Sequence, residues 1–393
     1  MAVRLADAVR SRARVSRLAT EVTLVDQLDY HQLVTELHEV AAGSIPPDAV
    51  ALPLSRTLAG KAIRFLQTRV TGFDYAGRRV ATEAGELAYD ILVIALGSET
   101  DFFGIEGLEE HSLTLKSLSD ALVIKERVEQ SFTQARDEDR AQERRRLLTL
   151  VIGGGGFTGT ELAGEMADRV RDLGREYGVA PGEARIVVAE AGPSLLSGFD
   201  PGLVRTARRI LESQGVELLL GAPAVRVTGD TVELKSGESI PYGTLIWTGG
   251  VKASELVARS GLTAGVRGRL VVNPYLESVD YSNVFVVGDA ALIVNPTTGR
   301  PLAPSAQLAL QHADCAAQNV LAQLRGTERV PYVPKVVGEV VSVGRINGLA
   351  KIGPFAFDGR PAHMLKRGTV LRYLYMLGGL PMVWDWLRVA SVF

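Results

Sequence analysis

Cysteine is almost absent from this sequence of 393 residues, in which Cys315 stands alone. A disulfide framework needs at least two cysteines, and so does a redox-active dithiol. Cysteines and histidines are nowhere spaced as the ligands of a zinc site are. The sequence therefore predicts no disulfide, no dithiol chemistry and no metal.

Long apolar runs and an excess of one charge are missing too. Residues 373–384 are the longest apolar candidate for a membrane span, but they fall short of the ~20 residues needed and Pro381 interrupts them. The first 25 residues carry five arginines and no apolar core of the secretory kind. With a formal net charge of −2, no overall field attracts nucleic acid. We expect a folded chain without a membrane span or a nucleic-acid partner.

Short β-rich apolar runs alternate with helical stretches along most of the chain. Such runs are typical of parallel strands buried on both faces, so the alternation predicts an α/β, doubly wound fold. One polar helix is expected over residues 115–146, an Ala- and Gln-rich helix over 301–321, and two short strands after residue 336, before an amphipathic stretch over 364–377. The clearest strands are expected at residues 22–25, 91–95, 148–152, 186–189, 244–247 and 284–287.

A glycine-rich turn follows the expected strand 148–152 and leads into a helix. Its G-x-G-x-x-G pattern consists of Gly154, which permits a tight turn, Gly156, which lets the backbone approach a pyrophosphate, and Gly159, which lets helix and strand pack closely. The helix that begins at Thr160 then presents free N–H groups to phosphates, and Thr158, within the turn, and Glu161, at the start of the helix, are further candidate contacts. The turn predicts a dinucleotide site, although a glycine turn without a ligand is the alternative.

Glu190 ends the next expected strand. A carboxylate at this position accepts hydrogen bonds from the adenosine ribose and repels a 2′-phosphate. The sequence therefore favours NADH over NADPH. The gap between Gly159 and Glu190 is long, which we assign to an extended helix and loop over residues 171–183.

Two more strand ends flank this nicotinamide unit in the sequence. The strand at 284–287 runs into Gly288 and Asp289, whose carboxylate could bind the ribityl hydroxyls of FAD, and the strand at 91–95 ends in Ala95 and Gly97, which are small enough for a close approach to a ligand. Each motif alone is weak. Their order indicates two Rossmann-like dinucleotide-binding domains, with the NADH domain inserted in the FAD domain.

In these motifs the chain resembles the type II NADH:quinone oxidoreductases, within the flavoproteins that have two dinucleotide-binding domains. The resemblance implies FAD with its adenosine ribose on Asp26 and its ribitol on Asp289, and a stretch over residues 30–43 that approaches the flavin, with Thr35 as a contact. It also implies that Gly250 closes over the nicotinamide. We expect an FAD domain over residues 1–111 and 269–335, an NADH domain over 112–268 and a C-terminal domain over 336–393.

The beginning of the chain departs from the family pattern of strand, glycine loop and helix. Residues 1–19 match the helix alone, so the first part of the FAD domain is expected to be incomplete. Two explanations are open: the sequence starts downstream of the true start, or this form binds FAD poorly.

The resemblance also implies a quinone-binding site. Ala306, Gln307 and Gln311 match a family stretch beside the flavin, and the two glutamines lie four residues apart, on one helix face. A glutamine amide can donate to a quinone carbonyl. Glu165 is expected to assist proton delivery. The alternatives are two solvated glutamines, and a surface pair formed by Glu161 and Glu165.

Residues 364–377 mix apolar and aromatic side chains with Lys366, Arg367 and Arg372. This composition is typical of an interfacial segment, in which each cation contributes about 1 kcal/mol at an anionic membrane. We expect a peripheral enzyme on the cytoplasmic face of the cell membrane. A helix packed on the core, or on the partner of a homodimer, is the alternative.

Together these features predict FAD-dependent oxidation of NADH, with electron transfer to a membrane quinone and no proton pumping. Sulfide:quinone and thioredoxin-type activities need the cysteine pair that is missing. A soluble NADH-dependent reductase of another acceptor remains open, as does an NADH-binding sensor without FAD.

Overall fold

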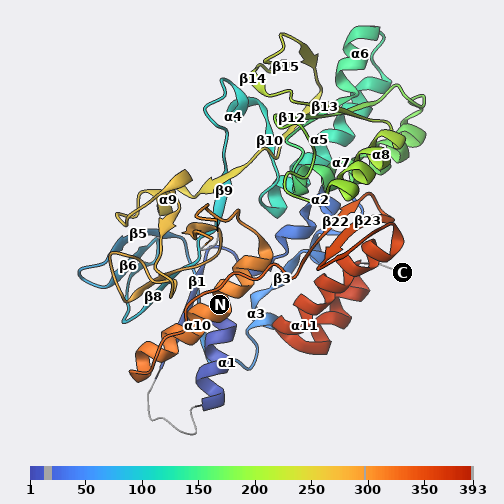
Figure 1. Cartoon of the computed structure of the whole chain (residues 1–393). Helices are drawn as coiled ribbons and strands as arrows, with labels where there is room; N and C mark the ends of the chain where they lie inside the picture. The colour runs from blue at the N-terminus through green and yellow to red at the C-terminus, as the bar shows by residue number, and fades with distance from the viewer. Residues whose placement is uncertain (13–19, 296–297, 391–393) are drawn as a thin grey trace. The chain divides into compact units, whose positions relative to one another are not determined.

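The computed structural model describes residues 1–12, 20–295 and 298–390, and the chain divides into two compact units (Figure 1). Unit 1 comprises Met1–His31, Pro53–Glu99 and Val251–Val336. Unit 2 comprises Gln32–Leu52, Thr100–Gly250 and Val337–Phe393. Each unit is thus assembled from separated stretches of sequence.

A five-stranded parallel sheet forms the centre of unit 2. Strand β11 lies between β12, the next strand of the sheet along the chain, and β17, which comes much later. The sheet order therefore reverses at the end of β11, which is where α/β sheets bind ligands. The strands, in spatial order, are β10 (Leu113–Thr114), β17 (Thr244–Trp247), β11 (Thr149–Gly153), β12 (Arg185–Glu190) and β13 (Val216–Leu220).

Successive residues of β11 face two different layers. Leu150 and Ile152 join the core formed with the helices, whereas Val151 joins a second core with a small antiparallel sheet. This explains why the strand sequence is continuously apolar. The helices are α2 (Leu37–Ala41), α5 (Leu118–Arg136), α7 (Phe157–Tyr177) and α8 (Pro201–Ser213), and the antiparallel sheet contains β14 (Ala224–Val227), β15 (Thr231–Leu234) and β16 (Ser239–Pro241).

The prediction of a single helix over residues 115–146 is wrong. Helix α5 ends at Arg136, and α6 (Ala141–Leu147) begins after a break in which Arg140 hydrogen-bonds Glu138. The charge run thus contains local ion pairs that take the place of a continuous helix. Helix α7, by contrast, extends to Tyr177 and ends at Gly178 in the left-handed conformation, as the long gap before Glu190 predicts.

The C-terminal part of unit 2 is an antiparallel sheet followed by a long helix. It contains three strands where two were predicted: β22 (Gly338–Val343), β23 (Asn347–Ile352) and β24 (Phe355–Asp358). Helix α11 (Arg360–Ala390) is longer than the predicted 364–377. It is kinked at Gly379, which has φ 70° and ψ −161°, just before Pro381.

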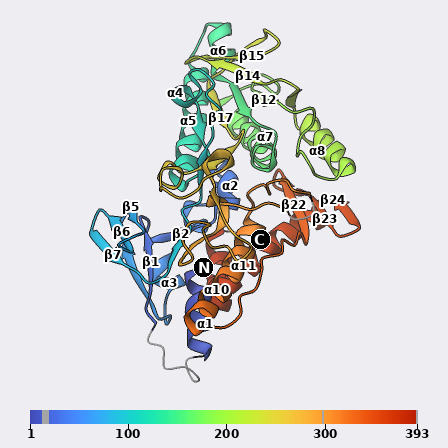
Figure 2. The same ribbon diagram turned by 60° about the vertical axis from the view of Figure 1, so that its left-hand side comes forward.

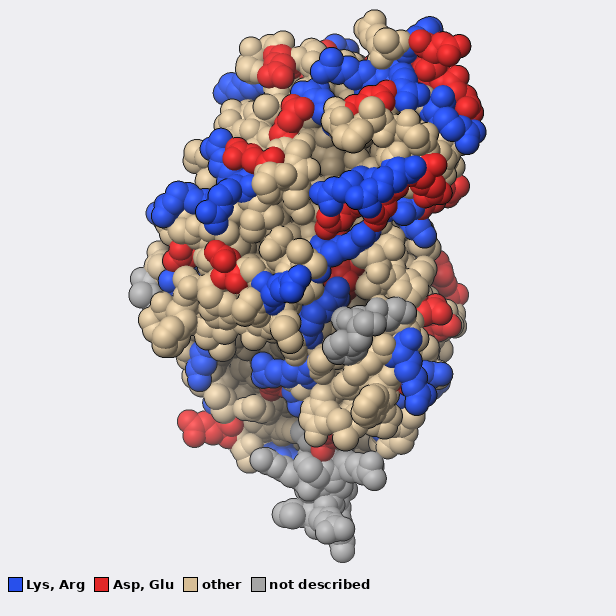
Figure 3. All heavy atoms as spheres, turned by 90° about the vertical axis from the view of Figure 1, so that its right-hand side faces the viewer, with Lys and Arg blue, Asp and Glu red and all other residues tan. Residues whose placement is uncertain are grey.

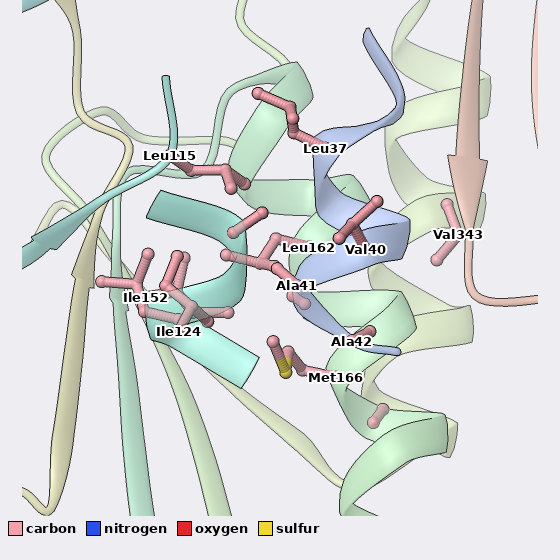
Figure 4. Close-up of a cluster of buried hydrophobic side chains, with 14 of the residues drawn as sticks. Leu37, Val40, Ala41, Ala42, Leu115, Ile124, Ile152, Leu162, Met166 and Val343 are labelled. Atoms are coloured by element: carbon pink, nitrogen blue, oxygen red, sulfur yellow. The ribbon is translucent and has the colours of Figure 1, made fainter. Parts of the chain in front are cut away.

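Helix α2 packs against α5 and α7, and Figure 4 shows its buried side chains beside theirs. Val40 and Ala41 of α2 meet Leu162 and Met166 of α7 in one fully buried cluster, which also includes Val343 of β22. These apolar residues alternate in the sequence with charged ones that are also buried. The charged residues are described with the site below.

The described part of unit 1 contains three parallel strand pairs, the shortest of which is β19 (Leu270–Val271) with β21 (Ala291–Leu292), and no described strand joins one pair to another. Strand β1 (Val22–Asp26) pairs with β4 (Ile63–Gln67), and β8 (Leu92–Ile94) pairs with β20 (Val284–Val286). The predicted helix over residues 1–19 is α1 (Ala2–Arg12), which lies beside α10 (Ala306–Arg325) in Figures 1 and 2, where Arg4 pairs with Asp314 at 3.0 Å. The remaining part of that prediction, residues 13–19, lies outside the described residues.

Helix α10 starts at Ala306, five residues later than predicted, because the Ser305 side chain caps it by accepting a hydrogen bond from Leu308 N–H.

An antiparallel sheet, grouped beside β1 in Figure 2, is formed by β5 (Val70–Asp74), β6 (Arg79–Thr82) and β7 (Gly85–Ala88). The short elements of unit 1 are α3 (Leu54–Thr57), β18 (Val251–Ala253), α9 (Glu255–Ala258), β19 (Leu270–Val271) and β21 (Ala291–Leu292). In unit 2 there is also α4 (Leu108–His111), and the short strands β2 (Tyr30–Gln32), β3 (Ala51–Pro53) and β9 (Ser98–Thr100) lie where the chain passes from one unit to the other.

Candidate functional site: two dinucleotide cradles and a buried charged cluster

The glycine turn of unit 2 lies at the point where the order of the parallel sheet reverses. Gly154 has φ 103°, a conformation that only glycine adopts readily, and its N–H donates to the carbonyl of Ala189 at 2.8 Å. A Cβ on Gly159 would lie 1.9 Å from the carbonyl oxygen of Gly154, whereas a Cβ on Gly156 would meet no protein atom within 4 Å. Gly159 thus serves the packing of α7, and Gly156 leaves open space at the start of the helix.

The carboxylate of Glu190 fixes this turn from the neighbouring strand. Its two oxygens accept hydrogen bonds from the N–H groups of Gly155, at 2.5 Å, and Gly192, at 2.6 Å. Glu190 is half-buried at the end of β12, so the negative charge lies beside the open space at Gly156. The cradle can accept a dinucleotide whose ribose carries free hydroxyls.

The other residues predicted to bind NADH surround the same turn. Thr158 is exposed in the first turn of α7. Gly250 follows β17, and its carbonyl accepts a hydrogen bond from Asp101 N–H at 3.0 Å. Trp247, which the sequence did not single out, lies against two glycines. A Cβ on Gly153 would lie 2.2 Å from the indole ring, and a Cβ on Gly249 would lie 2.4 Å from it. These glycines leave room for the indole.

In unit 1 the structure brings the two predicted flavin strand ends together. Ser98, just after β8, donates a hydrogen bond of 2.7 Å to Asp289, just after β20. Gly97 and Gly288 both have positive φ angles, 66° and 67°, and a Cβ on Gly97 would meet nothing within 4 Å. Ala95 is exposed on the same turn. The result is a second cradle, with a carboxylate and little side-chain bulk.

Two buried side chains that sequence reasoning missed hold the Gly288–Asp289 turn. Nδ1 of His312 accepts a hydrogen bond from Gly288 N–H at 3.1 Å, and the Arg269 guanidinium donates to the carbonyls of Asp289 and Ala291. Burial, and then the charge of Arg269, lower the pKa of His312 to about 4. The imidazole is therefore neutral and can accept this bond.

The predicted adenosine contact, Asp26, ends β1. One of its carboxylate oxygens accepts a hydrogen bond from Leu28 N–H at 2.9 Å. Burial raises the pKa of Asp26, while hydrogen bonds from the backbone at Leu28 and Gln27 oppose that rise. The acceptor is thus held at a strand end, the place that ribose-binding carboxylates occupy.

The predicted quinone glutamines lie on the first turns of α10, with Ala306 at its start. Both ends of the Gln311 amide bind the main chain of Lys335: Nε2 donates to its carbonyl at 2.7 Å, and Oε1 accepts from its N–H at 3.0 Å. Gln311 therefore ties α10 to the segment that follows it. The interpretation of Gln307 and Gln311 as freely solvated glutamines does not hold for Gln311.

The alternative that Glu161 and Glu165 form a surface pair is wrong, because only 9% of Glu161 and 1% of Glu165 are exposed. Glu165 accepts a hydrogen bond of 2.5 Å from Ser44. Burial raises the pKa of Glu165 to about 7, although the Ser44 hydrogen bond opposes the rise. Glu165 can therefore exchange a proton near neutral pH.

Glu161 belongs to a hydrogen-bonded group that joins α7, β22 and α11. Its Oε1 accepts a hydrogen bond of 2.5 Å from Nζ of Lys366, and the same ammonium donates to the Ser342 hydroxyl at 3.0 Å. His38 lies within 3.3 Å of that hydroxyl. Burial of Lys366 by itself lowers its pKa, but the nearby carboxylates, Glu161 first, outweigh this effect and raise it.

A second buried ion pair lies in the same group. Arg367 donates to Glu39 at 2.8 Å and lies 3.7 Å from Glu36, and both carboxylates are only 1% exposed. The prediction that Lys366 and Arg367 face an anionic membrane is therefore wrong, because both cations bind carboxylates inside the fold. We call Glu36, His38, Glu39, Glu161, Ser342, Lys366 and Arg367 the buried charged cluster.

Sequence reasoning singled out the stretch over residues 30–43 but named only Thr35 in it, and Thr35 is exposed. Glu36, His38 and Glu39 interrupt an apolar run in the same stretch, and that unusual placement was the available signal. Their partners on α11 are more than 300 residues away in the sequence. No local pattern could have paired them.

The comparisons with known proteins agree with this geometry. The sequence profile of the pyridine nucleotide-disulphide oxidoreductases matches residues 7–318. The chain is 32% identical over 373 residues to a protein of Staphylococcus saprophyticus named type II NADH:quinone oxidoreductase, covering 93% of this chain and 91% of that one. A protein of the same name from Staphylococcus aureus is also 32% identical, over 372 residues, with the same coverage.

Solved structures show the same fold at lower identity. NDH2 of Plasmodium falciparum, determined in complex with NADH, has a TM-score of 0.83 at 18% identity and is covered over 92% of its chain and 94% of this one. The sulfide:quinone oxidoreductase of Aquifex aeolicus has a TM-score of 0.76 at 19% identity, with 89% of its chain and 95% of this one covered. With two dinucleotide cradles and full-length relatives above 30% identity, this chain belongs to the type II NADH:quinone oxidoreductase family.

Proposed function

We propose that this chain oxidises NADH and transfers the two electrons through FAD to a quinone. The observation that carries the proposal is the glycine turn at the reversal point of the unit 2 sheet, held by the Glu190 carboxylate. The relatives named above are NADH:quinone oxidoreductases. Domain boundaries follow the same proposal: FAD over residues 1–111 and 269–335, NADH over 112–268, and a C-terminal domain over 336–393.

NADH binds to the unit 2 cradle. Its pyrophosphate lies against the open backbone at Gly154 and Gly156, and its adenosine ribose lies at Glu190. A 2′-phosphate there would face a carboxylate, so NADPH is a poor substrate. Other contacts come from Thr158, Gly159, Glu161 and Gly250.

The unit 1 cradle fits FAD, because Gly97 and Gly288 offer no side chain where a ligand approaches and Asp289 presents a carboxylate between them. When bound, FAD accepts a hydride and releases electrons, which no side chain of this chain can do. The protein's part is to hold it. The residues proposed for that task are Asp26, Thr35, Ala95, Gly97, Gly288, Asp289 and Ala306.

For the quinone we propose Gln307 as an amide donor to a quinone carbonyl. Gln311 would have to exchange its hydrogen bonds with Lys335 before it could do the same. Glu165, with a pKa of about 7, holds or releases a proton at neutral pH. These assignments rest on residue chemistry and on the family.

Contact with the cytoplasmic face of the membrane through α11 is a further part of the proposal. In the described part of the chain, no helix has the length and apolarity needed to cross a bilayer. Helix α11 exposes Met364 (72%), Tyr375 (58%), Leu380 (61%) and Trp384 (60%). Each could contribute about 1.5–3 kcal/mol on burial, which makes up for the two cations bound inside the fold. The alternative is that the same exposed residues of α11 form the interface of a homodimer.

On the face drawn in Figure 3, basic and acidic side chains lie intermixed. Apolar insertion of α11 should therefore dominate membrane binding. Leu380→Ser with Trp384→Ser should abolish sedimentation with phospholipid vesicles. A wild-type chain that stays in the supernatant, and dimerises through this face, would refute membrane contact.

The decisive experiment is an absorption spectrum of the purified protein before and after NADH is added. Flavin bands that bleach with NADH, followed by quinone-dependent turnover, are the expected result. Bleaching without any quinone reduction would indicate a reductase of another acceptor. A colourless protein that still binds NADH, even when it is refolded with FAD, would overturn the proposal in favour of a sensor.

A further inference from the structure

His312 is the buried side chain that links helix α10 to the turn of the proposed FAD site. It is 3% exposed and lies on the buried face of α10, one helical turn from Leu308 on one side and from Ala316 on the other. Its Nδ1 accepts a hydrogen bond from Gly288 N–H at 3.1 Å. This bond ties the helix to the turn that follows β20.

The bond fixes the tautomer of the imidazole. A ring nitrogen that accepts a hydrogen bond carries no proton, so the proton of neutral His312 lies on Nε2. Nε2 is buried and has no hydrogen-bond partner in the part of the chain that the structure describes. The ring of Tyr332 packs edge to face against the imidazole, with ring centroids 4.7 Å apart. The bond from Gly288 is therefore the polar contact that this buried ring makes with the described residues.

The groups around His312 keep the imidazole neutral. Burial and then the positive charge of Arg269 lower its pKa to about 4, while Asp289 opposes them. Burial raises the pKa of the Tyr332 hydroxyl to about 12, so the tyrosine is uncharged as well. A protonated His312 would be a second cation beside Arg269 and could no longer accept at Nδ1. At neutral pH the imidazole thus remains an acceptor.

The turn that His312 holds is the part of the cradle that presents the Asp289 carboxylate. That carboxylate accepts a hydrogen bond of 2.7 Å from Ser98, and Arg269 donates to the carbonyl of Asp289 at 3.2 Å. Gly288 itself has φ 67°, and a glycine can leave this conformation for many others at little cost. If the Gly288 N–H loses its acceptor, its peptide can turn toward water, and Asp289 then leaves its place.

We propose that His312 is a positioning residue for FAD, which sets the affinity of unit 1 for the cofactor by holding the Gly288–Asp289 turn through Nδ1. The proposal rests on the FAD site described under the proposed function, and it assigns His312 a role through Asp289 rather than through a contact of its own. The apparent affinity for a ligand falls with the fraction of the protein that has the binding conformation. Loss of the bond to Gly288 therefore weakens FAD binding even where the cradle residues are all present.

The test measures FAD affinity rather than turnover. The full chain, freed of bound flavin, is titrated with FAD at neutral pH, and the quenching of flavin fluorescence gives the dissociation constant. For His312→Leu we expect the dissociation constant to rise about tenfold to a hundredfold, because the Gly288 N–H is left without its acceptor. His312→Asn should stay close to the wild type, because an asparagine Oδ1 can occupy the position of Nδ1 and accept the same bond.

His111→Leu is the matched control, because His111 is exposed at the end of α4 in unit 2. Its dissociation constant for FAD should equal that of the wild type. Circular dichroism of each flavin-free variant shows whether it is folded. If His312→Leu does not fold, His312→Ala provides the same comparison.

An NMR spectrum of the chain labelled with ¹⁵N at histidine tests the bond without any flavin. The signals that disappear in His312→Asn belong to His312. They should show an unprotonated Nδ1 and a protonated Nε2, and they should not change between about pH 6 and about pH 8, where an unperturbed histidine titrates.

Three results would overturn the role of His312: FAD binding in His312→Leu as tight as in the wild type, binding in His312→Asn as weak as in His312→Leu, or a proton on Nδ1. A wild-type chain that binds no FAD would refute the proposed function, and the role of His312 with it. Unchanged affinity in Asp289→Leu would instead place FAD away from this turn. In both cases the ¹⁵N spectrum would still decide whether Nδ1 accepts the bond from Gly288.

Discussion

Nζ of Lys366 and Oε1 of Glu161 lie 2.5 Å apart, in side chains that are separated by 205 residues in the sequence. The bond joins α11 to α7, and the ammonium also donates to Ser342 of β22. Three elements of unit 2 therefore share one buried cation. Removing this cation should therefore weaken the packing of all three elements.

Lys366→Met should destabilise the protein by about 3–5 kcal/mol, because Glu161 would be left as a buried charge without its partner. Adding Glu161→Leu should restore much of that loss, since neither charge then remains. The measurement is chemical unfolding followed by circular dichroism. Lys351→Met, which breaks the more exposed pair with Asp200, is the control and should cost less than about 1 kcal/mol. Equal losses of stability in Lys366→Met and Lys351→Met would contradict the interpretation of Lys366 and Glu161 as a buried ion pair.

Stability should decline as the pH rises from about 4.5 to about 8 and level off above that. Burial raises the pKa of Glu165 to about 7 and that of Glu36 to about 8, above the ordinary 4.5. A raised carboxyl pKa stabilises the fold fully below the unfolded value, and this stability is lost as the pH rises through the folded value. Each group can contribute up to about 1.4 kcal/mol per pH unit. Thermal unfolding of Glu36→Gln and Glu165→Gln should show a flatter pH dependence than the wild type, and an identical slope would refute the titration.

Two alanine substitutions in the glycine turn should have opposite consequences. Gly159→Ala should lower the free energy of unfolding by about 1–3 kcal/mol, the usual cost of overpacking a core. The reason is that its Cβ would lie 1.9 Å from the carbonyl oxygen of Gly154. Gly156→Ala has open space in the protein and should leave the unfolding midpoint unchanged. It should nevertheless raise the KM for NADH, because the methyl group occupies the space proposed for the pyrophosphate. Unchanged NADH kinetics in Gly156→Ala would place the cofactor elsewhere.

Glu190→Gln should raise the KM for NADH by about tenfold and reduce the preference for NADH over NADPH. The substitution removes the charge that repels a 2′-phosphate, and it replaces one acceptor of the Gly155 and Gly192 N–H bonds with a donor. Initial rates with both cofactors measure the effect. Glu217→Gln on β13, whose carboxylate pairs with Arg185, is the control and should leave cofactor choice alone. An unaltered NADH to NADPH ratio in Glu190→Gln would count against the ribose contact.

The sequence was sufficient to predict the parallel strands and the glycine turn, because those features are encoded locally. The residues of β11 are continuously apolar since each faces a covered layer, and Gly154 needs a backbone conformation that other residues resist. The break between α5 and α6 escaped prediction, because a charge run is compatible both with a solvated helix and with local ion pairs.

The charged cluster could not be predicted, because its pairing is decided by tertiary structure. The amphipathic pattern predicts that Lys366 and Arg367 lie on a helix with both polar and apolar residues. It does not predict that both cations form ion pairs with buried carboxylates. Likewise the spacing of Glu161 and Glu165 predicts a shared helix face without saying whether it is buried. Of the exposed apolar residues on α11, Met364 and Tyr375 lie within the predicted amphipathic segment 364–377, whereas Leu380 and Trp384 lie beyond it.

The interleaving of the two units has a consequence for synthesis on the ribosome. Unit 1 needs residues up to Val336, and unit 2 needs α11, which comes at the very end of the chain. Neither unit can therefore complete its core while its later stretches are still inside the ribosome, and the nascent chain exposes unfinished apolar surfaces over most of its translation. Chaperone dependence should follow from chain order alone, and loss of α11 should remove one packing partner of the stretch Gln32–Leu52, since Trp386 Nε1 donates a hydrogen bond to the Ala49 carbonyl.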